Sequence, residues 1–444
     1  MKTHVLADDT GDTGNCTATL HPRAPMTLEA SGLTLDLVIQ LLLKLLHYSG
    51  ELSGIEIAQR LGLEFPVVEP AIDFIKRLHQ CEIVGGAGIG GPSYRYRITD
   101  AGRQRAMLFM ESSQYVGVAP VPLKQYVAYL EAYRAAMPRA ITRSRVREAF
   151  SHLVLSERVL DQVGPAIGAA HSMFVYGPPG NGKTVIAQAI RNLLEGDIAV
   201  PHAIEVEGHI VRIFDPVSHE RVAENAPAPG LLRPRASTDG RWVRCRRPMV
   251  MVGGELTLEA LDLSYSKQMG FYGAPVQTKA NGGVLVIDDF GRQRVAPRDL
   301  LNRWIVPLES RVDYLTLDTG QKFDLPFCVM VVFATNIKPA ELVDEAFLRR
   351  IHYKVFAENP TRAEFMEIFE GVCRGRGLAF DPALAEGLLG TLDARSIRFR
   401  GCHPRDLIDQ ALAHAEYLGE PRELTAELLE AACAAYFVDD TERA

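Results

Sequence analysis

The sequence of 444 residues predicts an α/β domain with a parallel sheet, preceded by a small helical domain with a β-hairpin and followed by a helical domain. Three observations predict this arrangement. Short apolar segments alternate with helical patterns from Phe150 to about Phe356, as in sheets of parallel strands. The pattern is helical throughout from Asn359 to Phe437. A glycine-rich loop, Gly177 to Thr184, stands between a strand and a helix of the alternating region.

The composition limits the class of protein. Hydrophobic residues make up 47% and charged residues 23%, as in globular proteins, and the length suits two or three domains. A net charge of −7 gives no overall attraction to nucleic acid, although a local basic patch is compatible with it. The 7 cysteines form no C-x-x-C pair, so we expect reduced thiols and no zinc site.

No segment predicts export or membrane insertion. Residues 1–26 are polar and lack the apolar core of a signal peptide. The most apolar stretch, Leu33 to Leu46, is too short to span a bilayer, and Asp36, Gln40 and Lys44 form one polar stripe along it. We therefore expect a cytoplasmic protein without a membrane partner, in which this stretch is a core helix.

The first part of the chain predicts a disordered tail at residues 1–27 and a small domain at residues 28–118. We expect three helices before His79, the second of them behind a capping box made by Ser53 and Glu56. A hairpin follows, with a glycine-rich tip before the strand Tyr94–Ile98. Three helices and a hairpin, followed by the string Tyr96 to Gly102, resemble a winged helix-turn-helix domain.

Residues 119–150 are expected to link this domain to the α/β domain at residues 151–356, which a helical domain at residues 357–444 follows. The linker combines prolines with a helical pattern from Leu123 to Ala136 and then an arginine run. The run consists of Arg139, Arg143, Arg145 and Arg147. Such a run usually forms a solvated face, and contact with a neighbouring subunit or a phosphate backbone is the alternative.

The glycine-rich loop matches the phosphate-binding pattern G-x-x-x-x-G-K-[ST]. Its residues are Gly177, Pro178, Pro179, Gly180, Asn181, Gly182, Lys183 and Thr184, and Val185 continues into a helix. Glycines let the backbone curl so that successive N–H groups point at phosphate oxygens, and the helix N-terminus adds a positive dipole end. We expect Lys183 to reach the terminal phosphates and the Thr184 hydroxyl to hold Mg²⁺.

Two later strands end in polar side chains. Four apolar residues precede Asp288 and Asp289, as in a strand buried on both faces, and ligands bind at the carboxyl ends of such strands. Asp288 suits Mg²⁺ held through water, and Asp289 suits the orientation and deprotonation of an attacking water. After Val329 to Ala334 comes Asn336, whose amide would hold the same water or, equally, cap the next turn.

The order of these motifs resembles the AAA+ ATPase superfamily over about residues 140–440. Gly177–Thr184 looks like Walker A, Val284–Asp289 like Walker B and Asn336 like sensor 1. Arg350, with Arg349 beside it, falls where the arginine finger of that superfamily sits, and Arg405 matches sensor 2 at the start of a lid helix.

The resemblance implies a P-loop NTPase fold, hydrolysis of ATP with Mg²⁺, and a finger that acts from an adjacent subunit. Asp289 departs from the usual glutamate, although the shorter acid occurs in initiator and helicase-loader relatives.

The segment between Walker B and sensor 1 narrows the resemblance. A helix at Leu300–Arg311 precedes two short strands, Tyr314–Leu317 and Lys322–Pro326, around Asp318 to Gln321, which is a hairpin signature. A hairpin at this place resembles the pre-sensor-1 insertion of MoxR-like ATPases. This resemblance implies a homo-oligomer that remodels a macromolecular partner. The subunits would form a ring or a helical assembly, and we expect a hexamer.

Two further segments leave alternatives open. Phe271 and Tyr272 stand between glycines, which suits a loop that grips a polymer or aromatics packed under a turn. Arg241 to Arg247 is rich in arginine around Trp242. That pattern suits binding of phosphate, nucleic acid or an acidic neighbour or, slightly ahead, the exposed face of a strand.

Three functions agree with these motifs: a remodelling ATPase with the winged helix as adaptor for a protein partner, a DNA-associated ATPase, and a nucleotide-switched scaffold with little hydrolysis. Residues 28–118 carry ten acids and eight bases, and Glu69 and Asp73 open the presumed recognition helix. The bases that offer a basic face are Lys76, Arg77, Arg95 and Arg97. We therefore favour a protein partner over duplex DNA.

Overall fold

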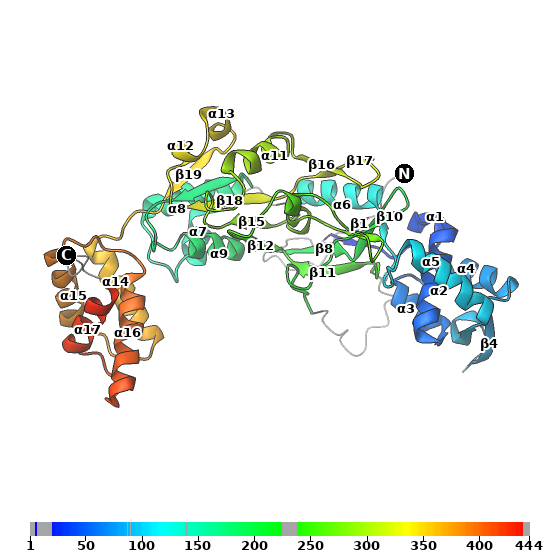
Figure 1. The fold of residues 1–444 in the computed structure, drawn as a ribbon, viewed down its shortest axis with the longest axis horizontal. Coiled ribbons are helices and arrows are strands. Elements are labelled where there is room, and N and C mark those ends of the chain that lie inside the picture. The colour runs from blue at the N-terminus through cyan, green and yellow to red at the C-terminus, as the bar shows by residue number, and fades with distance from the viewer. Residues whose placement is uncertain are drawn as a thin grey trace. The chain divides into compact units, whose positions relative to one another are not determined.

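The structure, a computed structural model, describes residues 20–86, 88, 90–137, 141–223 and 238–437, together with the backbone of Val5 and Leu6 (Figure 1). The chain divides into two compact units. Unit 1 contains Met1–Pro138, Leu194–Leu285 and Asp299–Val329, and unit 2 contains Arg139–Leu193, Val286–Arg298 and Met330–Ala444. Both units are discontinuous in sequence, whereas the domains that we expected are continuous ranges.

We expected a tail at residues 1–27. Its first 19 residues lie outside the described residues, except for the backbone of β1 (Val5–Leu6). That strand pairs with β2 (His21–Pro22). Thr27 then accepts a hydrogen bond from the backbone N–H of Ala30 and so caps the short helix α1 (Leu28–Ser31).

The N-terminal part of unit 1 consists of helices and a small sheet. The helices are α2 (Leu35–Ser49), α3 (Gly54–Leu61), α4 (Phe65–Arg77) and α5 (Asp100–Ser112). The strands β3 (Glu51–Ser53), β5 (Tyr94–Ile98) and β4 (Cys81–Gly86) form an antiparallel sheet in that order. The predicted helices, the hairpin and the capping box of Ser53 and Glu56 are confirmed.

The core of this part differs from the prediction at one residue. Apolar side chains of α2 are buried as expected, but Lys44 is only 1% exposed, although it belongs to the predicted polar stripe. Its ammonium donates a hydrogen bond of 3.1 Å to the carbonyl of Ser113, just beyond α5. Burial lowers the pKa of Lys44 to about 8.

The rest of unit 1 contains a helix and several small sheets. Its helix α6 (Leu123–Ala136) packs tyrosines against strands β8 (Asp197–Pro201), β9 (Ala203–Val206) and β10 (His209–Arg212). The other elements are β6 (Val121–Pro122), β11 (Trp242–Arg246), β12 (Met249–Val252), β13 (Ser264–Ser266), β14 (Phe271–Gly273), α10 (Val276–Lys279) and most of α11 (Pro297–Ser310). The predicted hairpin is confirmed as β16 (Val312–Thr316) and β17 (Lys322–Pro326), with Thr316 opposite Lys322.

The first open segment of unit 1 adopts the packed alternative, and the second contains a strand. Tyr272 in β14 is buried, and its hydroxyl accepts a hydrogen bond from the N–H of Asp318. Trp242 in β11 packs against Tyr129 with the ring centres 4.8 Å apart.

Three of the four arginines of the second segment have acidic partners, and the fourth, Arg247, donates to the carbonyl of Gly282. Arg241 forms a buried ion pair with Asp239, Arg244 pairs with Asp197, and Arg246 pairs with Glu220. Three of the four arginine charges of this segment are therefore compensated within unit 1.

Unit 2 contains the predicted parallel sheet. Strand β7 (Met173–Tyr176) pairs in parallel with β18 (Met330–Thr335) on one side and with β19 (Tyr353–Phe356) on the other. Strand β15 (Val284–Ile287), whose first two residues belong to unit 1 and last two to unit 2, lies next to β18, so these four strands follow the order β15-β18-β7-β19. The helices α7 (Arg143–Ala149), α8 (Glu157–Gly168) and α9 (Lys183–Leu193) belong to the same unit, as do α12 (Pro339–Leu342) and α13 (Glu345–Leu348).

The C-terminal helices of unit 2 have a core of their own. They are α14 (Arg362–Gly375), α15 (Pro382–Ala394), α16 (His403–Leu418) and α17 (Ala426–Tyr436), drawn from orange to red in Figure 1. Buried residues such as Phe365, Phe369, Leu389 and Leu407 hold them together. Across the described residues, no helix combines the length and the apolar character that a membrane crossing requires.

Candidate functional site

The glycine-rich loop joins the buried strand β7 to α9, as predicted. Gly177 has a φ of 147°, and a Cβ atom there would lie 2.4 Å from the carbonyl oxygen of Ala357. Gly180 has a φ of 84°, and its Cβ would lie 2.5 Å from Cys402 Sγ. Side chains are excluded at both positions, so the loop curls closely against the segments that follow β19 and precede α16.

Lys183 lies inside the curl of this loop. Its side chain is only 8% exposed, and its ammonium donates hydrogen bonds to the carbonyls of Gly177 (3.2 Å) and Pro178 (2.8 Å). Burial lowers the pKa of Lys183, and the charges of Asp289 and Asp288 partly oppose that shift. The loop thus holds a cation close to two carboxylates.

The next side chain connects the loop to the end of β15. Thr184 Oγ1 donates a hydrogen bond of 2.8 Å to Asp288 Oδ2. Every residue of β15 is buried, so the strand sets the position of Asp288 rigidly. A hydroxyl and a carboxylate are the hard oxygen ligands that suit Mg²⁺.

Asp289 and Asn336 lie side by side beyond the ends of β15 and β18. Asp289 has a φ of 48°, and its Oδ1 accepts a hydrogen bond of 3.2 Å from Asn336 Nδ2. The amide oxygen of Asn336 is buried and accepts no hydrogen bond from any described residue. An acceptor of this kind suits a water molecule held beside Asp289.

The donor set fits magnesium better than a metal held entirely by protein. Within the described ranges, no group of three or more His, Cys, Asp or Glu side chains is arranged to hold a metal ion. Mg²⁺ usually binds through one or two carboxylates together with phosphates and water, and Thr184 and Asp288 can supply the protein ligands.

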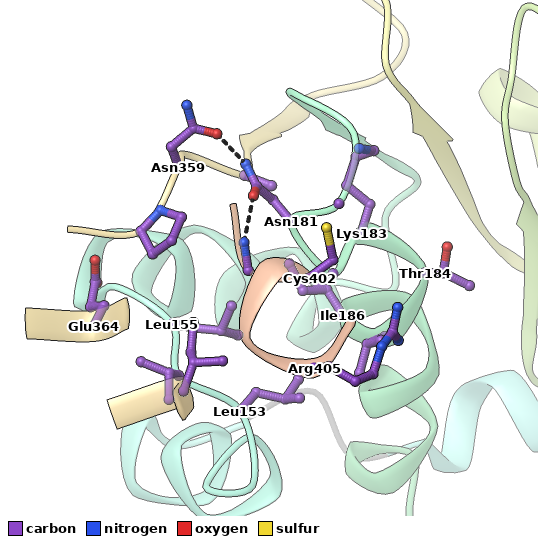
Figure 2. A pocket seen from close by; sticks show the side chains of 18 of the residues that line it. Leu153, Leu155, Asn181, Lys183, Thr184, Ile186, Asn359, Glu364, Cys402 and Arg405 are labelled. Carbon is purple, nitrogen blue, oxygen red and sulfur yellow. Dashed lines mark hydrogen bonds between the residues drawn. The ribbon is translucent and has the colours of Figure 1, made fainter. Parts of the chain in front are cut away.

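These side chains line one cavity of about 910 Å³, at the upper end of the range for ligand sites. The expected residues along its wall are Pro179 to Val185, Asp288, Asp289, Asn336 and Arg405. Gly177 and Pro178 contribute instead the carbonyls that bind Lys183. Figure 2 shows the close surroundings, with Leu153, Leu155 and Ile186 forming an apolar part of the wall.

Asn181 is bonded to residues that the sequence did not indicate. Its Nδ2 donates to Asn359 Oδ1 at 2.8 Å, and its Oδ1 accepts from the N–H of Gly401 at 3.1 Å (Figure 2). The side chain is buried. The loop is therefore tied to both ends of the chain segment that contains α14 and α15.

The three arginines predicted as site residues do not all lie at the cavity. Arg405 at the start of α16 lines the cavity, and its guanidinium donates to Asp406 Oδ1 through Nε (2.9 Å). The hydrogen bond and charge of Asp406 raise the pKa of Arg405. Arg349 is 76% exposed and pairs with Glu345, and neither Arg349 nor Arg350 is among the described residues that line the cavity.

Parts of the chain are similar to known families. Residues 157–227, which contain the glycine-rich loop, match the family of magnesium chelatase, subunit ChlI. Residues 361–435 match a domain of unknown function, DUF8689. No curated protein matches the chain.

Solved structures with some similarity include a Thermotoga maritima RuvB P216G mutant, with 15% identity and a TM-score of 0.35 over 68% of this chain and 72% of that one. Brucella abortus NtrX in complex with ADP has 15% identity and a TM-score of 0.40 over 67% of this chain and 60% of that one. Together with the site geometry, the match of residues 157–227 supports the AAA+ P-loop ATPase superfamily as the class of this protein.

Proposed function

We propose that this protein is an AAA+ ATPase that hydrolyses ATP in an oligomeric assembly in order to remodel a macromolecular partner. The observation that carries the proposal is the convergence of Lys183, Thr184, Asp288, Asp289 and Asn336 on one cavity. Phosphoryl transfer requires positioning and charge neutralisation around the γ-phosphate more than covalent chemistry, and these side chains supply both.

Each side chain then has one task. The curl of the loop offers N–H groups to the phosphates, and Lys183 swings from the loop carbonyls to the terminal phosphates. Thr184 and Asp288 hold Mg²⁺, which when bound neutralises charge on the phosphate oxygens. Asp289 takes the proton of the attacking water, and the free amide oxygen of Asn336 accepts a hydrogen bond from that water.

The remaining walls of the cavity suit the base of the nucleotide and a lid formed by helices. Leu153, Leu155 and Ile186 give an apolar surface for the flat base of a nucleotide. The helices α14 to α17 act as the lid, from which Arg405 reaches the phosphates as sensor 2.

Arg350, with Arg349 beside it, supplies the arginine finger to a neighbouring subunit. Their place outside the cavity agrees with that role, because a finger acts in the site of another subunit. The active unit is then a homo-oligomer, for which we propose a hexamer.

The N-terminal part of unit 1 is proposed to be a winged helix that docks a protein partner. Of the four bases that offer a DNA-binding face, three have acidic partners: Lys76 pairs with Asp73, Arg95 pairs with Glu51, and Arg97 pairs with Glu51 and Glu82. The fourth, Arg77, donates to the backbone carbonyl of Asp73. Neutralised bases attract phosphates weakly, which favours protein over duplex DNA. The hairpin β16–β17, after Walker B, supports the MoxR-like subtype.

Phosphate release by the full chain, at a protein concentration high enough for assembly, tests the proposal. We expect turnover that requires Mg²⁺ and stops when the metal is chelated. Nucleotide binding without detectable turnover would favour the switched scaffold instead. A gel shift with duplex DNA at increasing salt separates the partner classes, and tight binding at physiological salt would reverse our preference for protein.

A further inference from the structure

Gln293 makes several hydrogen bonds to the backbone of the turn that carries Asp289. Its side chain is 9% exposed. The amide nitrogen Nε2 donates to the carbonyl of Asp288 (3.0 Å) and to the carbonyl of Asp289 (3.3 Å). The amide oxygen Oε1 accepts from the N–H of Gly291 (2.8 Å). One side chain thus binds the backbone on both sides of the residue that we propose as general base.

The conformation of Asp289 explains why such support matters. Its φ of 48° lies in the left-handed region, which is unfavourable for a residue with a Cβ atom, although Asp tolerates it better than most. A backbone of this kind persists only where its surroundings impose it. The two carbonyls that Gln293 binds belong to the peptide groups before and after Asp289, so Gln293 opposes rotation of either group.

The neighbours of Asp289 are held by other elements. Asp288 continues from the buried strand β15. Phe290 is fully buried, its N–H donates to the carbonyl of Ala334 (2.8 Å), and its carbonyl accepts from Thr335 Oγ1 (2.6 Å). Loss of Gln293 would therefore free the carbonyls of Asp288 and Asp289 and loosen the two peptide groups around Asp289. Each group would keep one hydrogen bond, from the Asp289 N–H to Asp288 Oδ1 or from the Phe290 N–H to Ala334, and the strands would stay in place.

We propose that Gln293 is a positioning residue that holds the Asp289 carboxylate beside Asn336 in the geometry required for proton transfer. The inference rests on the proposed function, because the position of Asp289 matters only if it acts on water. Gln293 is absent from the described lining of the cavity, so its removal should change the catalytic step and spare nucleotide binding.

The first test compares kcat with affinity in the full chain. Gln293→Ala should lower kcat for ATP hydrolysis roughly 10- to 100-fold, the scale of a misplaced catalytic group. The dissociation constant of ADP should change less than about twofold, since Lys183, Thr184 and the glycines keep their contacts. Gln188→Ala is a matched control on the exposed face of α9 and should behave as the wild type.

The second test uses an isosteric acid. In Gln293→Glu the ionised carboxylate cannot donate to the carbonyls of Asp288 and Asp289, whereas the protonated form can donate to one of them. Burial among carbonyl oxygens raises the pKa of such a carboxyl group. The kcat of this variant relative to wild type should therefore rise several-fold from pH 8 to pH 5.5, and the same ratio for Gln293→Ala should stay flat.

The outcomes separate the inference from the proposed function. If the wild type hydrolyses ATP and Gln293→Ala does so equally fast, the inference is wrong and the proposed function stands. Loss of ADP affinity in proportion to kcat would also overturn it, because the turn would then serve the whole site. A wild type that binds ADP without hydrolysing ATP would overturn both.

Discussion

Thr184 Oγ1 and Asp288 Oδ2 lie 2.8 Å apart and share a hydrogen bond, which joins the first turn of α9 to the end of β15. The two residues are far apart in the chain, and each follows a strand of the same sheet. A hydroxyl and a carboxylate held at this distance can contact one metal ion, directly or through water.

The first prediction concerns this pair. Thr184→Val removes the hydroxyl with almost no change of shape, so we expect the Mg²⁺ concentration for half-maximal hydrolysis to rise about tenfold or more, in line with the loss of one oxygen ligand. Thr184→Ser keeps the hydroxyl and should stay close to wild type. Phosphate release measured over a magnesium titration checks both. An unchanged titration for the valine variant would rule out Thr184 as a ligand.

The second prediction concerns the arginine finger. Arg350→Ala should abolish hydrolysis and spare nucleotide binding, because the guanidinium acts in the site of an adjacent subunit. Arg349→Ala, whose side chain pairs with Glu345 on the surface, is the comparison that tells which arginine is the finger.

Mixing two inactive variants distinguishes an arginine that acts in the site of an adjacent subunit from one that acts within its own subunit. Arg350→Ala has intact Asp289, and Asp289→Asn has intact Arg350, so mixed assemblies contain complete sites between unlike subunits. We expect partial recovery of phosphate release on mixing. Equal loss of binding and hydrolysis by Arg350→Ala alone would contradict the finger.

The third prediction concerns Asn181, which bonds Asn359 and the N–H of Gly401. Asn181→Ala breaks both bonds and should weaken ADP binding more than Asn359→Ala, which breaks one. A buried hydrogen bond contributes about 0.5–1.5 kcal/mol, so the double mutant should show a coupling of that size. Calorimetric titration of the four proteins with ADP measures it, and strictly additive losses would mean that the two amides act independently.

The fourth prediction concerns the buried Lys44. Its pKa is lowered from 10.5 to about 8, so below pH 8 the folded protein holds a charged ammonium in an apolar core and is destabilised by the full amount. Stability attributable to this group rises as the pH rises from about 8 towards 10.5, where the unfolded chain also loses the proton. Lys44→Met removes the charge and should stabilise unit 1 by about 1–3 kcal/mol at pH 7.

Thermal melts of the full chain at pH 7 and pH 10 provide the measurement for Lys44→Met. The gain in Tm over wild type should be largest at pH 7 and should shrink towards pH 10. A variant that is less stable than wild type at pH 7 would show that the hydrogen bond to Ser113 outweighs the cost of burial.

The sequence predicted the centre of the site because its signals are local or follow from sheet geometry. The pattern of Gly177 to Thr184 is one uninterrupted motif, and Asp288 and Asn336 each follow an apolar strand. Parallel strands end at a common edge, so polar residues after two of them come together. The structure does bring them to one cavity.

The sequence missed the contacts that depend on tertiary packing. Asn359 lies 178 residues after Asn181, and neither stands in a pattern that indicates the other. Gln293 is a single glutamine after a turn, and no pattern in the sequence indicates its hydrogen bonds to the backbone around Asp289.

The burial of charged side chains could not be predicted from the sequence either. Lys44 and Arg241 belong to stretches that predict polar faces, yet both residues are buried. Lys44 donates to the carbonyl of Ser113, just beyond α5, and Arg241 forms an ion pair with Asp239. The predicted domains are continuous ranges, whereas residues 194–285 and 299–329 belong to one compact unit with the N-terminal part. Segment-by-segment patterns carry no information on such long-range association.

The most direct measurement is nucleotide binding and phosphate release by three full-length proteins: wild type, Lys183→Ala and Asp289→Asn. We expect the wild type to bind adenine nucleotide and turn over ATP, Lys183→Ala to lose binding, and Asp289→Asn to bind as tightly as wild type with turnover reduced roughly 100-fold or more. A wild type that retains no adenine nucleotide, or an Asp289→Asn variant as active as wild type, would contradict the central claim that this cavity binds and hydrolyses ATP.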